Sequence, residues 1–107
     1  MNHAMNERPI PEAAVEDENS VEMLRVWIAA KKLHCSMKVG MYRETSKVSE
    51  EKAWGVLLAD VARHLSKALE SGYGVDADVA LSTIREKFND ELNAPTSSTD
   101  GGFVKER

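Results

Sequence analysis

The stretch from Ala53 to Leu69 (AWGVLLADVARHLSKAL) constrains the fold most, because it is the longest continuous apolar pattern in the chain. Its large apolar residues recur at steps of three and four, the spacing that puts them on one face of an α-helix. Ser49 precedes the pattern as an N-cap, and Gly72, with Gly74 behind it, provides the stop. The apolar face consists of Trp54, Leu57, Leu58, Val61, Leu65 and Leu69. The pattern predicts an amphipathic helix that other elements must cover.

Two segments before this helix, residues 22–29 (EMLRVWIA) and 33–40 (LHCSMKVG), alternate apolar and polar side chains as β-strands do. A connecting loop with an even number of residues opposes Ile28 to Leu33, whereas an odd number would mix the two faces. The connection lacks the Gly, Asn or Asp that accept a positive φ, so we favour a four-residue loop over a two-residue turn. The apolar face of this hairpin would hold Leu24, Val26, Ile28, Leu33, Cys35 and Met37.

A second helix is predicted after Asp76, which can cap it, and Asn93 and Pro95 end it. Its apolar stripe is Ala77, Leu81, Ile84, Phe88 and Leu92. The ends of the chain contain few large apolar groups that could offset the entropy of ordering. We therefore expect residues 1–20 to be a flexible acidic arm and residues 95–107, rich in Ser, Thr and Gly, to be a disordered tail.

The expected fold is an α+β domain over residues 21–94, in which two helices cover one face of an antiparallel β-hairpin (ββαα). A chain of 107 residues with 42% hydrophobic residues buries only a modest core. The hairpin also has two open edges that invite pairing with another strand. We therefore expect a homodimer, in which two hairpins could form a four-stranded sheet.

The composition argues against several classes of function. The net charge is −4, whereas nucleic-acid and anionic-membrane binding need concentrated positive charge. The single cysteine excludes an intrachain disulfide and a cysteine-rich zinc site. No run approaches the roughly 20 apolar residues of a membrane span, and the start of the chain lacks an export signal. We expect a cytoplasmic protein without catalysis, cofactor or metal.

The hairpin segments and residues 53–65 (AWGVLLADVARHL), in this order and spacing, resemble a small family of uncharacterised bacterial domains. The resemblance covers about residues 8–92. Its recognisable points are Trp27, Trp54, Gly55, Asp60 and His64. It implies a bacterial single-domain protein and transfers no catalytic or binding residue.

The polar face of the hairpin is the candidate binding surface. The preferred register opposes Arg25 to Ser36 and Trp27 to His34, with Lys31 and Lys32 at the tip. The predicted surface comprises Met23, Arg25, Trp27, His34 and Lys38. An aromatic side chain among basic groups fits a protein partner, a second subunit or the acidic arm. It also leaves open the alternative of nucleic-acid binding through base stacking and phosphate contacts.

A second alternative is a small metal or ligand site at Asp60 and His64, which lie one helical turn apart. Arg63 offers Asp60 a competing partner, so we favour a surface hydrogen-bonded pair over a functional site. Cys35 belongs to the core face, where a thiol behaves as a small hydrophobe. Gly55 costs about 1 kcal/mol inside a helix, which suggests that a strand, a helix or a ligand approaches closely there.

Overall fold

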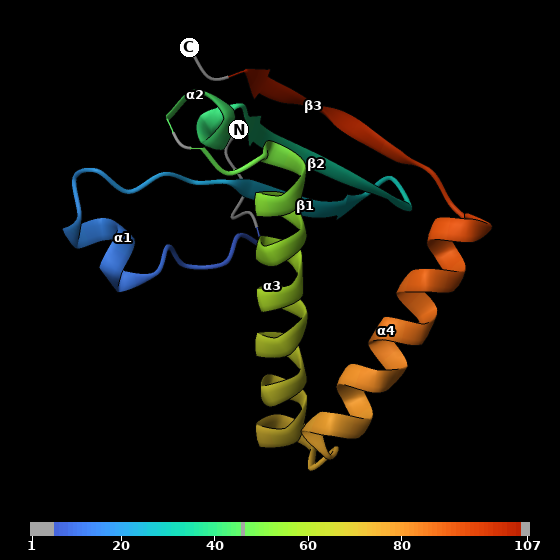
Figure 1. Ribbon diagram of the computed structural model, residues 1–107. Helices are drawn as coiled ribbons and strands as arrows, with labels where there is room; N and C mark the ends of the chain where they lie inside the picture. Colours follow the sequence, from blue (N-terminus) through green and yellow to red (C-terminus); the bar gives the residue numbers. More distant parts are fainter. Residues whose placement is uncertain (1–5, 46, 106–107) are drawn as a thin grey trace.

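The computed structural model describes residues 6–45 and 47–105 and has an α+β fold (Figure 1). Its elements, in chain order, are α1 (Glu12–Glu16), β1 (Leu24–Ala29), β2 (Lys32–Val39), α2 (Met41–Thr45), α3 (Glu50–Tyr73), α4 (Ala77–Asn93) and β3 (Thr99–Lys105). The strands form one mixed sheet in the order β1-β2-β3. None of the helices in the described ranges is both long enough and apolar enough to cross a membrane.

The register predicted for the hairpin is confirmed. Ile28 lies opposite Leu33, Val26 opposite Cys35 and Leu24 opposite Met37. The predicted four-residue loop is wrong, because Ala29 pairs with Lys32 and leaves a two-residue turn. Ala30 and Lys31 take φ values of 52° and 63° without a glycine. A turn of this kind matches the twist of the two strands, which offsets a cost of about 1–2 kcal/mol for each left-handed residue.

The predicted disordered tail is also wrong, because residues 99–105 form β3 and pair in parallel with β2. Gly101, with φ of 123°, lies opposite Cys35. A Cβ atom at Gly101 would overlap the main-chain carbonyl of Cys35, so this close approach requires glycine. The glycines that make the segment look disordered in sequence are what allow it to reach the sheet.

The two long helices begin where the sequence predicts, but α3 continues through Gly72, the predicted stop, to Tyr73. The Ser49 hydroxyl accepts a hydrogen bond from the Lys52 amide (3.1 Å), which caps α3. Gly74 ends α3 in the left-handed conformation, with φ of 71°. The Asp76 carboxylate caps α4 by accepting hydrogen bonds from the amides of Asp78 and Val79.

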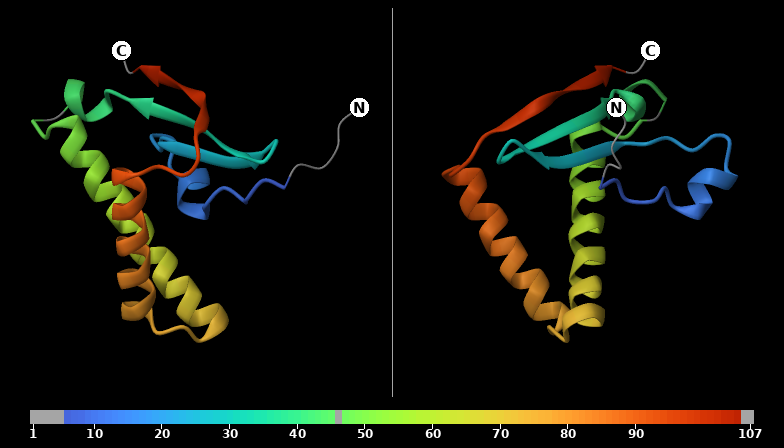
Figure 2. Two further views of the ribbon diagram at one scale, coloured as in Figure 1. Left: turned by 90° about the vertical axis from the view of Figure 1, so that its right-hand side faces the viewer. Right: turned by 180° about the vertical axis from the view of Figure 1, so that it is seen from behind.

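The expectation that both helices cover the apolar face of the hairpin is wrong. Helices α3 and α4 pack against each other near the turn that joins them and then diverge as a V, with the sheet at the open end (Figures 1 and 2). Contacts between these helices and the strands are sparse. Ile28, predicted to be in the core, is 72% exposed. The cause is geometric, because two helices that diverge cannot both lie flat on one small sheet.

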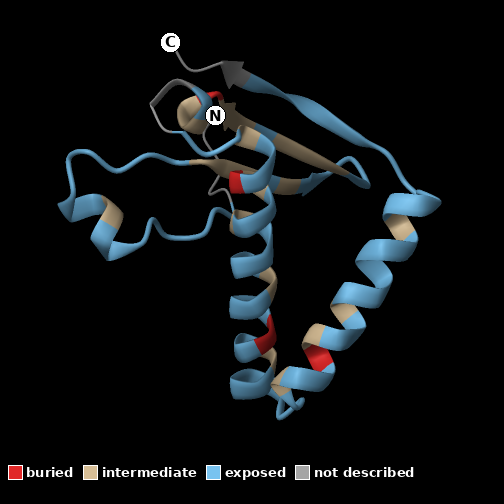
Figure 3. Ribbon diagram, in the orientation of Figure 1, coloured by how far each residue is buried: buried red, intermediate tan, exposed pale blue. Residues whose placement is uncertain are grey.

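Few residues of the described chain are buried. Ser66 and Ala80 are buried where α3 meets α4, and Ala53 is buried at the start of α3 (Figure 3). The close approach expected at Gly55 is absent, since no atom lies within 4 Å of the position that a Cβ would take. One chain thus leaves much of its apolar surface in contact with solvent.

The carboxylate of Glu50 fastens the end of the sheet to α3. Its oxygens accept hydrogen bonds from the amides of Gly40 (2.9 Å), Tyr42 (3.0 Å) and Arg43 (3.0 Å). They also accept one from the Trp54 indole (2.8 Å). These hydrogen bonds, chiefly the one from the Gly40 amide, lower the pKa of Glu50 below its ordinary value. Desolvation of the carboxylate acts in the opposite direction but is outweighed. This carboxylate joins β2, α2 and α3.

We expect Glu50→Gln to lower Tm at neutral pH by several degrees, because the variant loses charge-assisted hydrogen bonds. A carboxylate whose pKa is lowered on folding stabilises the fold above its unfolded-state pKa of about 4.5 and loses this effect as the pH falls through its folded-state value. The difference in Tm between the wild type and Glu50→Gln should therefore shrink to zero on acidification from pH 6. Thermal melts followed by circular dichroism measure it. Glu51→Gln is the matched control, and an equal loss in that variant would contradict the prediction.

Candidate functional site

The structure brings the predicted surface residues together on one side of the β1–β2 hairpin. Arg25 lies opposite Ser36, and Trp27 lies opposite His34. The Lys38 amide donates a hydrogen bond to the Met23 carbonyl (3.0 Å), which continues the same register. Arg25, Trp27, His34 and Lys38 are all partly buried. The predicted grouping of these residues is confirmed, whereas their role in binding stays a prediction.

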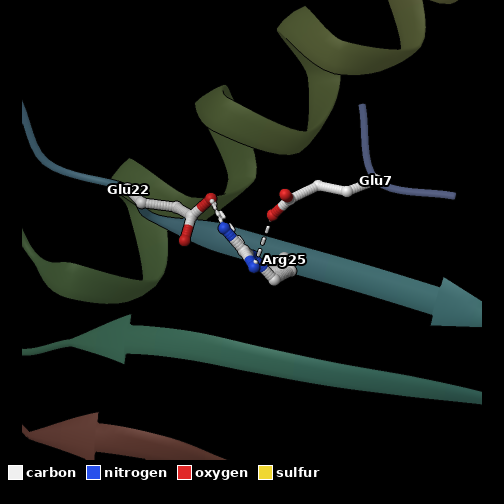
Figure 4. Close-up of polar contacts among 3 residues, drawn as sticks. All are labelled: Glu7, Glu22 and Arg25. Carbon is white, nitrogen blue, oxygen red and sulfur yellow. Dashed lines mark hydrogen bonds and ion pairs between the residues drawn. The ribbon is translucent and has the colours of Figure 1, made fainter. Parts of the chain in front are cut away.

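The guanidinium of Arg25 forms ion pairs with two carboxylates, those of Glu7 and Glu22 (Figure 4). Its Nε and Nη2 atoms donate hydrogen bonds to Glu22 Oε2, at 3.3 Å and 3.1 Å. Its Nη1 atom lies 2.9 Å from Glu7 Oε2. The hydrogen bonds that Arg25 donates to Glu22, and then the charges of Glu22 and Glu7, raise the pKa of Arg25. Glu22 comes from the same strand region, whereas Glu7 comes from the arm.

An open pocket of about 670 Å³, which we call the arm pocket, lies between the arm and β1 and is lined by residues from Asn6 to Trp27. Its charged lining comes from Glu7, Arg8, Glu22 and Arg25, and Trp27 contributes an aromatic wall. The apolar lining comes from Pro9, Ile10, Pro11, Val15, Val21 and Val26. The volume is in the range of small-molecule sites, and the lining combines apolar side chains with charged and polar ones.

Two other side chains of the hairpin, His34 and Lys32, also have acceptors nearby. His34 Nε2 lies 3.0 Å from the Ala29 carbonyl, which can only accept, so Nε2 carries the proton in this contact. Lys32 Nζ pairs with the Asp100 carboxylate at 2.7 Å. Much of the positive charge on this face is therefore matched within the chain, which disfavours the nucleic-acid alternative.

Asp60 and His64 are both exposed on α3, and the structure shows no direct contact between them. Asp60 instead lies 3.7 Å from Arg63. Its side of the helix borders a second, open pocket of about 540 Å³ whose lining is otherwise mainly apolar. Within residues 6–45 and 47–105, no three His, Cys, Asp or Glu side chains gather as a metal site would require. The partly buried Cys35 is a free thiol.

Sequence reasoning missed Glu7 and Glu22 as partners of Arg25. The acidic character of the arm was visible, with one arginine against five carboxylates in residues 1–20. The spacing of Glu22 and Arg25 gives no strand-face signal, since these residues lie three apart. The path of the arm through α1 decides which of its acidic side chains reaches Arg25. No local sequence pattern specifies that path.

Comparison with known proteins identifies the family. The model of a family described as a domain of unknown function, DUF5076, matches residues 7–96. The chain belongs to this family. This confirms the resemblance seen in the sequence. No curated protein matches the chain.

One solved structure similar to this DUF5076 chain comes from the photosynthetic bacterium Rhodopseudomonas palustrus and is described as a "putative pyruvate dehydrogenase". The two chains are 26% identical, and their superposition has a TM-score of 0.63. The match covers 89% of this chain and 91% of the other. The similarity thus extends over most of both chains.

Proposed function

We propose that this DUF5076 protein is a cytoplasmic bacterial homodimer that acts as a non-catalytic binding or scaffolding module. The dimer would be formed by the α3 and α4 helices, and the hairpin surface around Arg25 and Trp27 would bind a protein partner. One observation carries the proposal, namely the amount of apolar helix surface that a single chain leaves uncovered.

The surface area of the chain exceeds that of a folded monomer of the same mass. Its accessible surface is 9129 Å², against about 6,000 Å² for a compact monomer of 11.9 kDa. Its radius of gyration is 16.0 Å, against about 13 Å. The excess of about 3,000 Å² is more than the roughly 800 Å² that each partner buries in a standard interface. An obligate dimer would account for much of it.

Several large apolar residues of the V contribute to the exposed surface. Phe88 is 50% exposed on α4, and Leu65 is 49% exposed on α3. Leu58, Val61 and Leu92 are exposed to a similar or greater degree. Large apolar groups that recur at helical spacing but remain in solvent are typical of a surface that another chain covers.

The inner side of α3 suits a helix as the covering element. Ser66 is buried against α4, and Ala62, Ala59 and Gly55 precede it by four, seven and eleven residues on the same helical face. Small side chains let two helices approach closely. The free space at Gly55 would then be filled by the second copy. This arrangement would cover exposed apolar residues of α3 and α4 that a joining of sheet edges would leave in solvent, so we favour it over the four-stranded sheet.

Size-exclusion chromatography with light scattering tests the dimer. We expect twice the chain mass of 11.9 kDa down to low micromolar concentration. A monomer at high micromolar concentration would overturn the proposal. Gly55→Leu is an informative variant, because a single chain accommodates the larger side chain without a clash. Loss of the dimer in this variant would support close packing at Gly55.

The description of the structural neighbour calls for a second test, because it assigns that protein an enzymatic activity. The purified dimer can be assayed for oxidation of pyruvate in the presence of an electron acceptor. We expect no turnover above a buffer control. Turnover that follows the protein through purification would overturn the non-catalytic part of the proposal.

A further inference from the structure

We infer that the second half of α4, residues 85–93, covers the apolar face of the sheet in a second copy of the chain, and that each copy covers the other in this way. The inference rests on the proposed homodimer and names the part of the second copy that completes the sheet. It follows from two apolar surfaces that a single chain leaves exposed and holds apart.

The first surface is the apolar face of the sheet. Residues paired across neighbouring strands lie on the same side of a sheet, so the pairing of Met37 with Phe103 extends the apolar face of the hairpin onto β3. Ile28 is 72% exposed, Phe103 is 69% exposed and Val26 is 48% exposed. A small sheet becomes stable by packing one face against helices or against another sheet. This face therefore lacks part of its covering layer.

The second surface is the second half of the apolar stripe on α4. Leu81 and Ile84 are partly buried, whereas Phe88 is 50% exposed and Leu92 is 67% exposed. These four residues recur at steps of three and four, so they share one side of the helix. Residues 85–93 extend for about 13 Å along the helix axis, and three strands span about 10 Å from the first to the last. The exposed half of the helix therefore has the length needed to cross the sheet.

The connection between α4 and β3 holds the two surfaces apart within one chain. Strand β3 follows α4 after a short linker and begins opposite Leu33, beside the hairpin turn. The Glu91 carboxylate accepts hydrogen bonds from the amide and the hydroxyl of Thr96, both at 3.0 Å, which fixes the chain where it leaves α4. The helix therefore meets the sheet at one end and runs away from it (Figures 1 and 2). A second copy is not restricted by this connection.

A two-fold dimer covers both surfaces at once, because α4 of each copy then lies on the sheet of the other. A different protein would have to supply two separate surfaces to do the same. The area is sufficient, since each chain exposes about 3,000 Å² more than a compact monomer and a standard interface takes about 800 Å² from each partner. These considerations favour a second copy as the occupant of the sheet face.

A direct test is Ile28→Asp in the full chain. Because Ile28 is 72% exposed, the change costs the folding of a single chain little, whereas in the dimer it would bury a charge beneath α4 of the second copy. We expect the dissociation constant of the dimer to rise by about 100-fold or more, measured by light scattering across a dilution series. Ser36→Asp is the matched control, since it places the same charge at an exposed position on the opposite face of the sheet and should leave the dimer unchanged.

Cross-linking between two kinds of chain tests the contact itself. One chain carries Ile28→Cys and the other carries Leu92→Cys, and both carry Cys35→Ser so that each keeps a single thiol. When the two are co-expressed, a short bismaleimide should join them into a covalent dimer, because the two positions then meet across the interface. Either kind of chain alone should not give this product, since its two thiols would belong to separate contacts of the two-fold dimer.

The outcomes separate this inference from the proposed dimer. If the wild type is a dimer and Ile28→Asp leaves its dissociation constant unchanged, the inference alone is overturned and the sheet face is free for a different occupant. Absence of the mixed covalent product, or its equal formation by one kind of chain alone, also overturns the inference alone. A monomeric wild type overturns the inference together with the proposed dimer.

Discussion

Phe88→Asp is expected to convert the proposed dimer to a monomer. Phe88 lies within the apolar stripe of α4 and is 50% exposed in one chain. An aromatic anchor at the centre of an interface contributes about 2 kcal/mol or more, and a two-fold interface contains it twice. The dissociation constant should therefore rise by about 1,000-fold or more. Light scattering across a dilution series measures it.

The thermal stability of Phe88→Asp should also fall sharply, because a monomer with so few buried residues retains little to hold it folded. Ser82→Asp is the matched control, since it introduces the same charge at an exposed position of α4 outside the apolar stripe. A dimer that persists in Phe88→Asp at low micromolar concentration would exclude this face as the interface. In a monomeric protein, by contrast, the substitution of a half-exposed phenylalanine would change Tm only slightly.

Gly101→Ala is expected to detach β3 from β2. The new Cβ would overlap the main-chain carbonyl of Cys35, and the φ of 123° at this position is unfavourable for any residue with a side chain. Neither the β3 backbone at Gly101 nor the β2 backbone at Cys35 can move without breaking hydrogen bonds of the sheet. The parallel pairing around Gly101 should therefore be lost. We expect hydrogen–deuterium exchange in residues 99–105 to become at least 10-fold faster and Tm to fall by several degrees.

Gly102→Ala provides a close control for this prediction. A Cβ at Gly102 would meet no atom within 4 Å, although the residue belongs to the same strand. It also removes one glycine from the unfolded chain, as Gly101→Ala does, so the entropic effects of the two substitutions match. Equal exchange rates in the two variants would show that β3 does not depend on close approach at Cys35.

The elements that sequence reasoning predicted correctly are those that a strong local pattern specifies. The register of β1 and β2 follows from alternation, because a shift of one residue would move every apolar side chain to the other face. Helices α3 and α4 follow from apolar spacing and from the caps Ser49 and Asp76. The grouping of Arg25 with Trp27 and His34 was predictable for the same reason, since it depends only on the register.

The errors share a different cause. The tight turn at Ala30 and Lys31 carries a local cost that pairing along the whole hairpin offsets. Strand β3 forms only because β2 offers it an edge, and its own sequence of Ser, Thr and Gly resembles a disordered tail. The return of Glu7 to Arg25 depends on a path through α1. In each case the deciding interaction joins parts of the chain that no short sequence window contains.

The sequence alone determined which residues form the main helices and the hairpin, and which faces of them are apolar, because helix and strand periodicity are properties of neighbouring residues. Only the tertiary structure decided how those faces are used. The angle between α3 and α4 arises from packing at Ser66 and Ala80, and it leaves the two apolar stripes apart instead of on the sheet. Packing angles depend on contacts between distant segments, which is why the uncovered surface was visible only in three dimensions.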